Sequence, residues 1–102
     1  MNYRVLFSPQ AEEDLTNIYR YIAESGYPER ALKYIERIEK FCLGLRTFPY
    51  RGRSMDHLIA GMRIVGFERR VQIALQISSE SVLILRVFYG GRDLDRAFPV
   101  GE

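Results

Sequence analysis

The stretch RRVQIALQISSESVLILRVFYGGRD, residues 69–93, carries two hydrophobic patterns that decide the fold. Its first half alternates between two sets of side chains, with Val71, Ile73, Leu75 and Ile77 on one side and Arg70, Gln72, Ala74 and Gln76 on the other. Such alternation is typical of a strand that is packed on one face and open on the other. Residues 69–78 are therefore predicted to be a strand with one solvent-facing side.

The second half, SVLILRVFY at residues 81–89, is apolar on both sides and is interrupted only by Arg86. Alternation predicts one face with Leu83, Leu85, Val87 and Tyr89, and an opposite face with Val82, Ile84, Arg86 and Phe88. A strand that is apolar on both faces is usually central in its sheet. We therefore place residues 81–89 between an N-terminal strand, NYRVLFS, and the strand at 69–78.

Two amphipathic helices are predicted upstream. The first begins at SPQAEEDL, where Ser8 can cap the helix and Pro9 fits its first position. Its apolar stripe comprises Ala11, Leu15, Ile18, Tyr19 and Ile22, and Gly26 ends it. The second begins after Pro28, and its stripe comprises Ala31, Ile35, Ile38, Cys42 and Leu45, widened by Tyr34, Phe41 and Phe48. Their short connection predicts an antiparallel hairpin.

These elements, with a further strand at MRIVGF, residues 62–67, predict an α+β fold. We expect an N-terminal strand, a helical hairpin and then a three-stranded antiparallel meander. The four strands would form a largely antiparallel sheet that the helices cover on one face and leave open on the other. A length of 102 residues suits one domain, residues 1–102.

Several functional classes find no support in the sequence. No apolar run reaches the roughly 18 residues of a membrane span, and the N-terminus lacks the apolar segment of a signal peptide, so a soluble cytoplasmic protein is predicted. Spacing indicates no metal site and no nucleotide loop, so we expect no cofactor. Cys42 is predicted to be a buried apolar residue. His57, the single histidine, follows Asp56 in a loop without a recognisable nucleophile.

The charge is small, +2, but thirteen of the fifteen basic residues are arginine, which grips carboxylates and phosphates through paired hydrogen bonds. Residues 51–70 form a local basic stretch, with Arg51, Arg53, Arg63, Arg69 and Arg70 against Asp56 and Glu68. Both features favour an acidic or phosphate-bearing partner.

Arg86 has two interpretations. It could form an internal ion pair with Glu68, Asp93 or Asp95, because an isolated guanidinium is costly to bury. Alternatively, it could belong to an anion-receiving surface on the open sheet face, near Arg70 and Arg63. The two are compatible, since a partner could displace the bridge.

Four segments in this order resemble the ParE toxins of the RelE/ParE superfamily of toxin-antitoxin systems. They are SPQAEEDLTNIYRYIAESG, ALKYIERIEKFCLGLRTFPYRGR, AGMRIVGFERRVQIALQI and VLILRVFYGGRDL, and they span most of residues 3–95. The resemblance implies a toxin that poisons DNA gyrase and is neutralised by an acidic ParD-like antitoxin. That antitoxin would combine a ribbon-helix-helix DNA-binding half with a flexible tail that wraps the hairpin and sheet.

The resemblance also suggests which residues make these contacts. The antitoxin would contact the hairpin at Leu15, Ile18, Tyr19, Ile22, Tyr34, Ile38 and Phe41. The target would meet Arg63, Arg70, Arg86, Tyr89 and Arg92. We expect no sequence-specific DNA binding by this chain alone, and self-association through the exposed hairpin when the antitoxin is absent.

Two alternatives stay open. RelE-like relatives cut messenger RNA, and in that case Arg63 and Arg86 would hold the scissile phosphate while Tyr89 handled protons. Because no convincing general base accompanies these arginines, a non-enzymatic toxin is favoured. The other alternative is a degenerate toxin that is retained as an antitoxin-binding module. The target prediction rests on an open sheet face that leaves Arg86 accessible.

Overall fold

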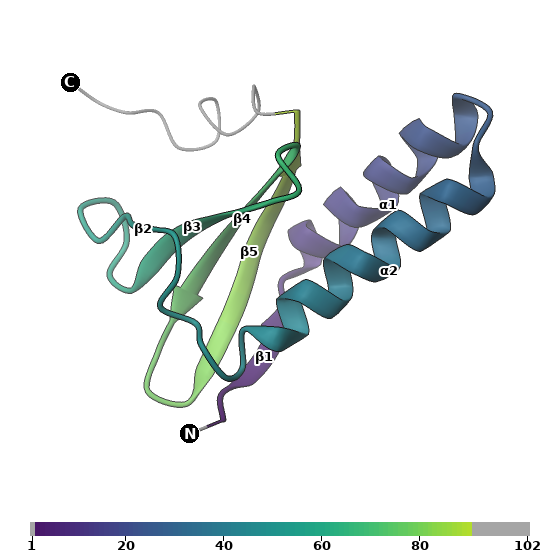
Figure 1. Cartoon of the computed structure of the whole chain (residues 1–102). Helices are drawn as coiled ribbons and strands as arrows, with labels where there is room; N and C mark the ends of the chain where they lie inside the picture. The colour runs from purple at the N-terminus through teal and green to yellow at the C-terminus, as the bar shows by residue number, and fades with distance from the viewer. Residues whose placement is uncertain (1, 91–102) are drawn as a thin grey trace.

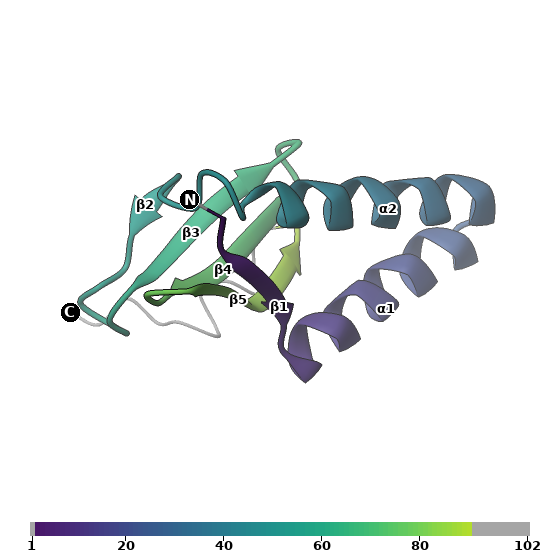
Figure 2. The ribbon, with the colours of Figure 1, turned by 90° about the horizontal axis from the view of Figure 1, so that it is seen from below.

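A computed structural model describes residues 2–90 of the chain. In chain order the elements are β1 (Arg4–Phe7), α1 (Pro9–Glu24), α2 (Pro28–Gly44), β2 (Arg53–Ser54), β3 (Met62–Phe67), β4 (Val71–Ile77) and β5 (Ser81–Tyr89). The two helices run side by side as a hairpin along one side of the sheet (Figures 1 and 2). None of the helices in this part of the chain is long and apolar enough to span a membrane.

The sheet has the strand order β1-β5-β4-β3-β2, so the predicted central position of residues 81–89 is confirmed. β1 pairs in parallel with β5, and the remaining pairs are antiparallel. The prediction of four strands was one short. β2 is a two-residue strand that pairs with Arg63 and Ile64 at the sheet edge, and two residues are too few to show a period.

The helices form where the capping residues predict. The Ser8 hydroxyl accepts a hydrogen bond from the Ala11 N–H at 2.9 Å, and Pro9 occupies the first turn of α1. Gly26, at φ +103°, adopts the left-handed conformation that lets the chain leave α1 and turn into α2. The apolar stripes of both helices then face the sheet.

The main core lies between the hairpin and the sheet. Val71, Ile73, Leu75 and Ile77 of β4 all face the helices, which confirms the predicted alternation. Leu15, Ile18, Ile38 and Cys42 meet them from the helical side. Cys42 is fully buried, as predicted.

The opposite sheet face is not the open polar surface that the sequence predicted. It carries a second buried apolar cluster, which consists of Met55, Met62, Ile64, Ala74 and Phe88, with Leu85 partly buried beside it. The prediction was based on the polar residues of β4. It failed because β3 and β5 also place large apolar side chains on this face, and Met55 covers them from the loop after β2.

A β-bulge also changes which side chains of β5 face the helices. Ala74 pairs with Arg86 but Leu75 pairs with Ile84, so Leu85 is an extra residue. Val82, Ile84, Val87 and Tyr89 consequently contact the main core, whereas Leu85 and Phe88 contact the outer cluster. The predicted faces were therefore wrong for residues 82–85, because simple alternation does not anticipate a bulge.

Candidate functional site

Arg86 is held by a residue that the sequence analysis did not consider as its partner. Its guanidinium donates two hydrogen bonds to the Asp14 carboxylate of α1, at 2.8 and 3.0 Å. The same carboxylate accepts the Val87 N–H at 2.8 Å. The predicted ion pair therefore exists, but its acceptor is Asp14 and not Glu68; the other two candidates, Asp93 and Asp95, lie outside the described residues.

Arg63 is also engaged within the chain. Met62 and Ile64 point into the outer cluster, so Arg63 between them projects to the helix side of the sheet edge. Its guanidinium donates to the carbonyls of Arg51 and Gly52 at 2.8 and 3.1 Å. The structure thus does not place Arg63 and Arg86 together on one exposed face.

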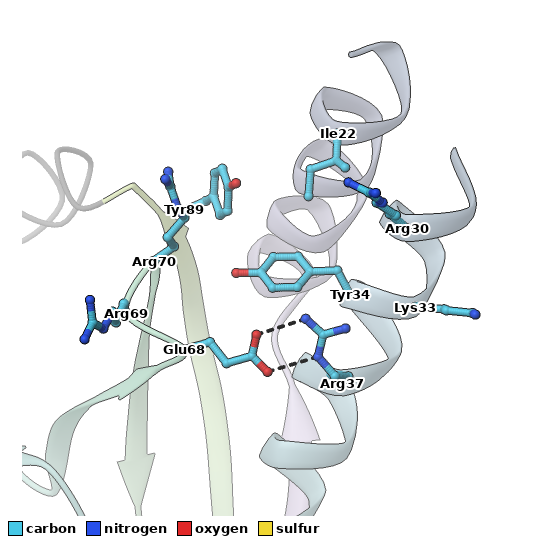
Figure 3. Close-up of a pocket in the computed structure, with 9 residues that line it drawn as sticks. All are labelled: Ile22, Arg30, Lys33, Tyr34, Arg37, Glu68, Arg69, Arg70 and Tyr89. Atoms are coloured by element: carbon cyan, nitrogen blue, oxygen red, sulfur yellow. Dashed lines mark hydrogen bonds and ion pairs between the residues drawn. The ribbon is translucent and has the colours of Figure 1, made fainter. Parts of the chain in front are cut away.

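Two of the other predicted target residues, Arg70 and Tyr89, do come together. They lie in a groove of about 500 Å³ between the helical hairpin and the ends of the central strands (Figure 3). The groove is lined by Ile22, Arg30, Lys33, Tyr34 and Arg37 from the hairpin, by Glu68, Arg69 and Arg70 from the β3–β4 turn, and by Tyr89 from β5. Arg92, the fifth predicted residue, lies outside the described residues.

The groove is strongly basic. Five of its nine lining residues are cationic and one, Glu68, is anionic, although the side chains of Lys33 and Arg69 point away from the hollow (Figure 3). Glu68 accepts two hydrogen bonds from Arg37, at 3.0 and 2.9 Å, which links the β3–β4 turn to α2. This bond lowers the pKa of the Glu68 carboxyl and raises that of the Arg37 guanidinium. The Glu68 carboxylate thus lies in the groove and is bound by Arg37 in the bidentate geometry with which arginine binds anions.

Aromatic rings line the groove beside these charges. The Tyr34 and Tyr89 rings meet nearly edge to face, with centroids 6.0 Å apart. Burial, followed by the proximity of Tyr89 and Glu68, raises the pKa of Tyr34, so its phenol stays protonated at neutral pH. The groove therefore combines a hydrogen-bond donor and apolar ring surface with cations.

The β3–β4 turn that supplies three groove residues is conformationally strained. Glu68 and Arg69 have φ values of 49° and 69°, in the left-handed region that glycine favours. Such positions cost about 1 kcal/mol or more each and persist where other interactions hold them. Here the Glu68 to Arg37 ion pair is one such interaction.

The predicted antitoxin residues divide between core and surface. Leu15, Ile18 and Ile38 are buried in the main core and offer no contact surface. Ile22 and Tyr34 line the groove, Phe41 is half-buried, and Tyr19 is exposed. An amphipathic stripe cannot by itself distinguish residues packed on the chain's own sheet from residues that await a partner.

The remaining candidates carry no site chemistry. Burial raises the pKa of the Cys42 thiol to about 12. His57 is exposed, and its neighbour Asp56 is held by the Gly61 N–H and the Ser54 hydroxyl, which lower the pKa of Asp56. Within residues 2–90 no cluster of His, Cys, Asp or Glu could hold a metal ion.

Sequence reasoning missed Asp14 and most of the groove. A signal for Asp14 was present, because it lies three residues after Ala11 and four before Ile18, on the buried stripe of α1. A carboxylate at such a position needs a partner. By contrast, the cations Arg30, Lys33 and Arg37 follow a surface helical spacing that resembles any solvated face, so no local signal marked them.

Comparison with known proteins begins with the fold. A chain of a solved structure described as the chromosomal ParDE TA system from P. aeruginosa matches with a TM-score of 0.73 at 23% identity, covering 85% of this chain and 95% of that chain. The match shows a shared fold. The fold and the groove together define a small α+β protein with a basic hollow between a helical hairpin and a mixed sheet.

The sequence places it in a family. The model of the ParE toxin of the type II toxin-antitoxin system, parDE, matches residues 5–94. Toxin ParE3 of Caulobacter vibrioides is 29% identical over 91 residues, which are 89% of this chain and 90% of that protein. The chain therefore belongs to the ParE toxin family of type II toxin-antitoxin systems.

Proposed function

We propose that this toxin is neutralised by an acidic ParD-like antitoxin, whose tail lies along the hairpin and enters the basic groove, and that it inhibits DNA gyrase. The gyrase proposal rests on membership of the ParE family, because the sheet face opposite the helices is filled by apolar side chains and Arg86 is bound to Asp14. The observation that carries the antitoxin part is the charge of the groove, with five cations against one carboxylate. An extended acidic tail suits this charge, because its carboxylates can pair with arginines while its apolar side chains cover the rings.

The proposed antitoxin contact uses the accessible part of the hairpin. Ile22 and Tyr34 in the groove and Tyr19 and Phe41 outside the core remain from the predicted set. Exposed Tyr21 and Leu32 lie on the same two helices and would also lose solvent exposure under a tail. The same exposed side chains favour self-association of the toxin when the antitoxin is absent.

The positions of the arginines favour a toxin that acts by binding over one that cuts RNA. Phosphodiester cleavage needs cations and a proton-transfer group aimed at one phosphate. Arg86 is bound to Asp14, Arg63 is bound to the carbonyls of the loop before β2, and Tyr89 packs against Tyr34 and Tyr21. These three groups therefore do not converge on a common point.

The target is tested with purified components. The toxin is added at micromolar concentration to a gyrase supercoiling assay, with and without the product of the neighbouring open reading frame. We expect the toxin to block supercoiling and the neighbouring protein to restore it. Undisturbed gyrase would contradict the target, and discrete cuts by primer extension on messages from induced cells would favour the ribonuclease instead.

The antitoxin groove is tested separately. The double variant Arg69→Gln, Arg70→Gln removes two groove cations, and we expect it to bind the antitoxin about tenfold more weakly by calorimetry, as for a pair of desolvated charge contacts. Arg4→Gln, an exposed change in β1 outside both the groove and the hairpin, is the control. Equal antitoxin affinity for both variants would show that the antitoxin tail does not bind in this groove.

A further inference from the structure

The loop between α2 and β2 presents a basic and aromatic surface that the toxin proposal does not use. With Arg53, the first residue of β2, it includes the sequence RTFPYRGR, residues 46–53, which we call loop 46–53, and no acidic residue occurs from position 44 to position 55. Phe48 is 71% exposed and Tyr50 is 65% exposed, the two highest values among the large apolar side chains of residues 2–90. Arg46, Arg51 and Arg53 are exposed beside them.

The loop is held in a defined shape by the rest of the chain. Pro49 is buried, and the Arg46 carbonyl accepts the Tyr3 N–H at 2.8 Å. Gly52, at φ +71°, lies so close to β3 that a Cβ would collide with the Ile64 carbonyl. Arg63 fixes the same segment through its two bonds to backbone carbonyls. The exposed rings are thus displayed by an anchored backbone, which lowers the entropy cost of binding.

The position of Phe48 differs from the sequence prediction. It was expected to extend the apolar stripe of the second helix, but α2 ends at Gly44 and the ring lies in solvent. Fold stability does not explain this exposure, because burying a phenylalanine would gain about 1.5 to 3 kcal/mol. A ring held in water next to arginines indicates a contact surface.

We propose that loop 46–53 binds single-stranded nucleic acid, with bases stacked on Phe48 and Tyr50 and phosphates held by Arg46, Arg51 and Arg53. Exposed aromatic rings interleaved with cations are the shared chemistry of proteins that bind single strands without sequence preference. Unpaired bases have free π faces, whereas the bases of a duplex are already stacked on one another. The site therefore prefers a single strand to a duplex.

Two other occupants fit this loop less well. A second copy of the chain would bring the same three arginines without a carboxylate in the loop, so the charges would repel. An acidic protein segment could pair with the arginines, but flat bases would also cover the exposed rings of Phe48 and Tyr50 by stacking. Loop 46–53 shares no residue with the antitoxin groove, although the Arg51 guanidinium lies over the ring of Phe41, 5.2 Å from its centroid. Nucleic-acid binding by this loop does not depend on gyrase being the target.

The test is fluorescence anisotropy of the full chain with labelled (dT)12, (rU)12 and a duplex of the same length. The wild-type chain is expected to bind the single strands with dissociation constants of about 1 to 100 μM at moderate salt, and the duplex more weakly. The DNA and RNA arms identify which single strand is preferred, and either preference supports the proposal.

Matched variants separate stacking from charge. Phe48→Ala should weaken single-strand binding about tenfold, whereas Tyr27→Ala, an exposed tyrosine in the helical hairpin connection, should leave it unchanged. Arg53→Gln should reduce the slope of log affinity against log salt by about 0.7, and Arg20→Gln should not change it. Phe48 is largely in solvent, so its variant should stay folded, which circular dichroism checks.

Three outcomes would overturn the proposal. The first is equal single-strand affinity for Phe48→Ala and Tyr27→Ala. The second is duplex binding as tight as single-strand binding. The third is binding of a hexaglutamate peptide through Arg46, Arg51 and Arg53 when (dT)12 and (rU)12 do not bind, since that result would assign the loop to an acidic protein.

Discussion

One carboxylate, that of Asp14, ties α1 to the half of β5 that β1 does not reach. β1 ends at Phe7, opposite Ile84, and beyond this point the edge of β5 faces the helix. Asp14 accepts the backbone N–H of Val87 there and both guanidinium bonds of Arg86. The Asp14 side chain therefore takes the place of a neighbouring strand as hydrogen-bond partner of β5, and Arg86 neutralises the charge of its carboxylate.

Asp14→Asn should destabilise the fold by about 2 to 3 kcal/mol, because it replaces charge-assisted hydrogen bonds of a largely buried carboxylate with neutral ones. The Asp14 side chain is 12% exposed and that of Arg86 is 30% exposed, so solvent screens the pair only in part. Urea unfolding measures the effect. Glu13→Gln, at the exposed neighbouring position, should change stability by less than about 0.5 kcal/mol. Similar effects of the two variants would contradict a structural role for Asp14.

Cys42 should make stability fall at alkaline pH. Burial raises the pKa of its thiol to about 12, so the folded state keeps its proton after the unfolded thiol, with a pKa near 8.5, has lost it. Stability is therefore complete below about pH 8.5 and falls by up to about 1.4 kcal/mol per pH unit towards pH 12. Comparing the wild type with Cys42→Ala by urea unfolding from pH 8 to pH 11 isolates this effect from the other groups. Parallel pH curves would show that the thiol does not contribute.

For individual residues, the sequence predicted which side chains are buried better than which side chains form ion pairs with one another. Cys42 and the helix-facing residues of β4 were identified because a periodic pattern states which side of an element is apolar. The predicted acceptors for Arg86 all lay near the strand and its turn, whereas the observed acceptor Asp14 lies seventy-two positions earlier. No periodic pattern relates two residues on different elements, so the charge on the buried stripe of α1 was the sole local indication.

The β3–β4 turn has a sequence that lowers the stability of the fold but supplies residues that line the groove. Two consecutive non-glycine residues, Glu68 and Arg69, adopt positive φ values, and both residues line the groove. Positions with such φ values favour Gly, and Asn or Asp among the other residues. The turn therefore uses a less stable sequence in a place where its side chains supply charge.

Arg69→Gly should raise the stability of the chain by about 1 kcal/mol, because glycine adopts a φ of 69° without steric cost. Arg69→Gln removes the same charge but keeps the strained backbone, so its stability should match the wild type. Thermal unfolding compares the three proteins, and calorimetry with the antitoxin should show similar weakening for both variants. A glycine variant no more stable than the glutamine variant would show that the turn is not strained.

Elements with a regular period were predictable, and their irregularities were not. Both helices and the three long strands were located from stripes, caps and alternation. The bulge at Leu85 and the short β2 were missed, since each depends on how a strand meets its neighbour. The bulge had the larger consequence. It exchanged the faces of residues 82–85. The second apolar cluster has a different origin, since most of its side chains come from β3, from Phe88 and from Met55.

Across the whole molecule, the expected arginine-bearing face is replaced by two separate basic surfaces. The groove lies along the first half of α2, with Arg30, Lys33 and Arg37, and loop 46–53 follows its last residue. A helix of 17 residues is about 25 Å long. In Figure 1 the segment between α2 and β2 leaves the end of α2 near β1, whereas the β3–β4 turn lies at the other end of the sheet. Two different ligands can therefore bind, one on each surface.

This separation predicts that the two binding activities can be removed independently. The double variant Arg69→Gln, Arg70→Gln should weaken antitoxin binding about tenfold and leave (dT)12 binding unchanged. Phe48→Ala should weaken (dT)12 binding about tenfold and leave antitoxin binding unchanged. Contacts so far apart act additively, so the triple variant should show both losses at the same sizes. Calorimetry with the antitoxin and anisotropy with (dT)12 on the same four proteins measure this. If either change weakened both ligands alike, the groove and the loop would form one continuous surface, and a single partner would then cover both ends of α2.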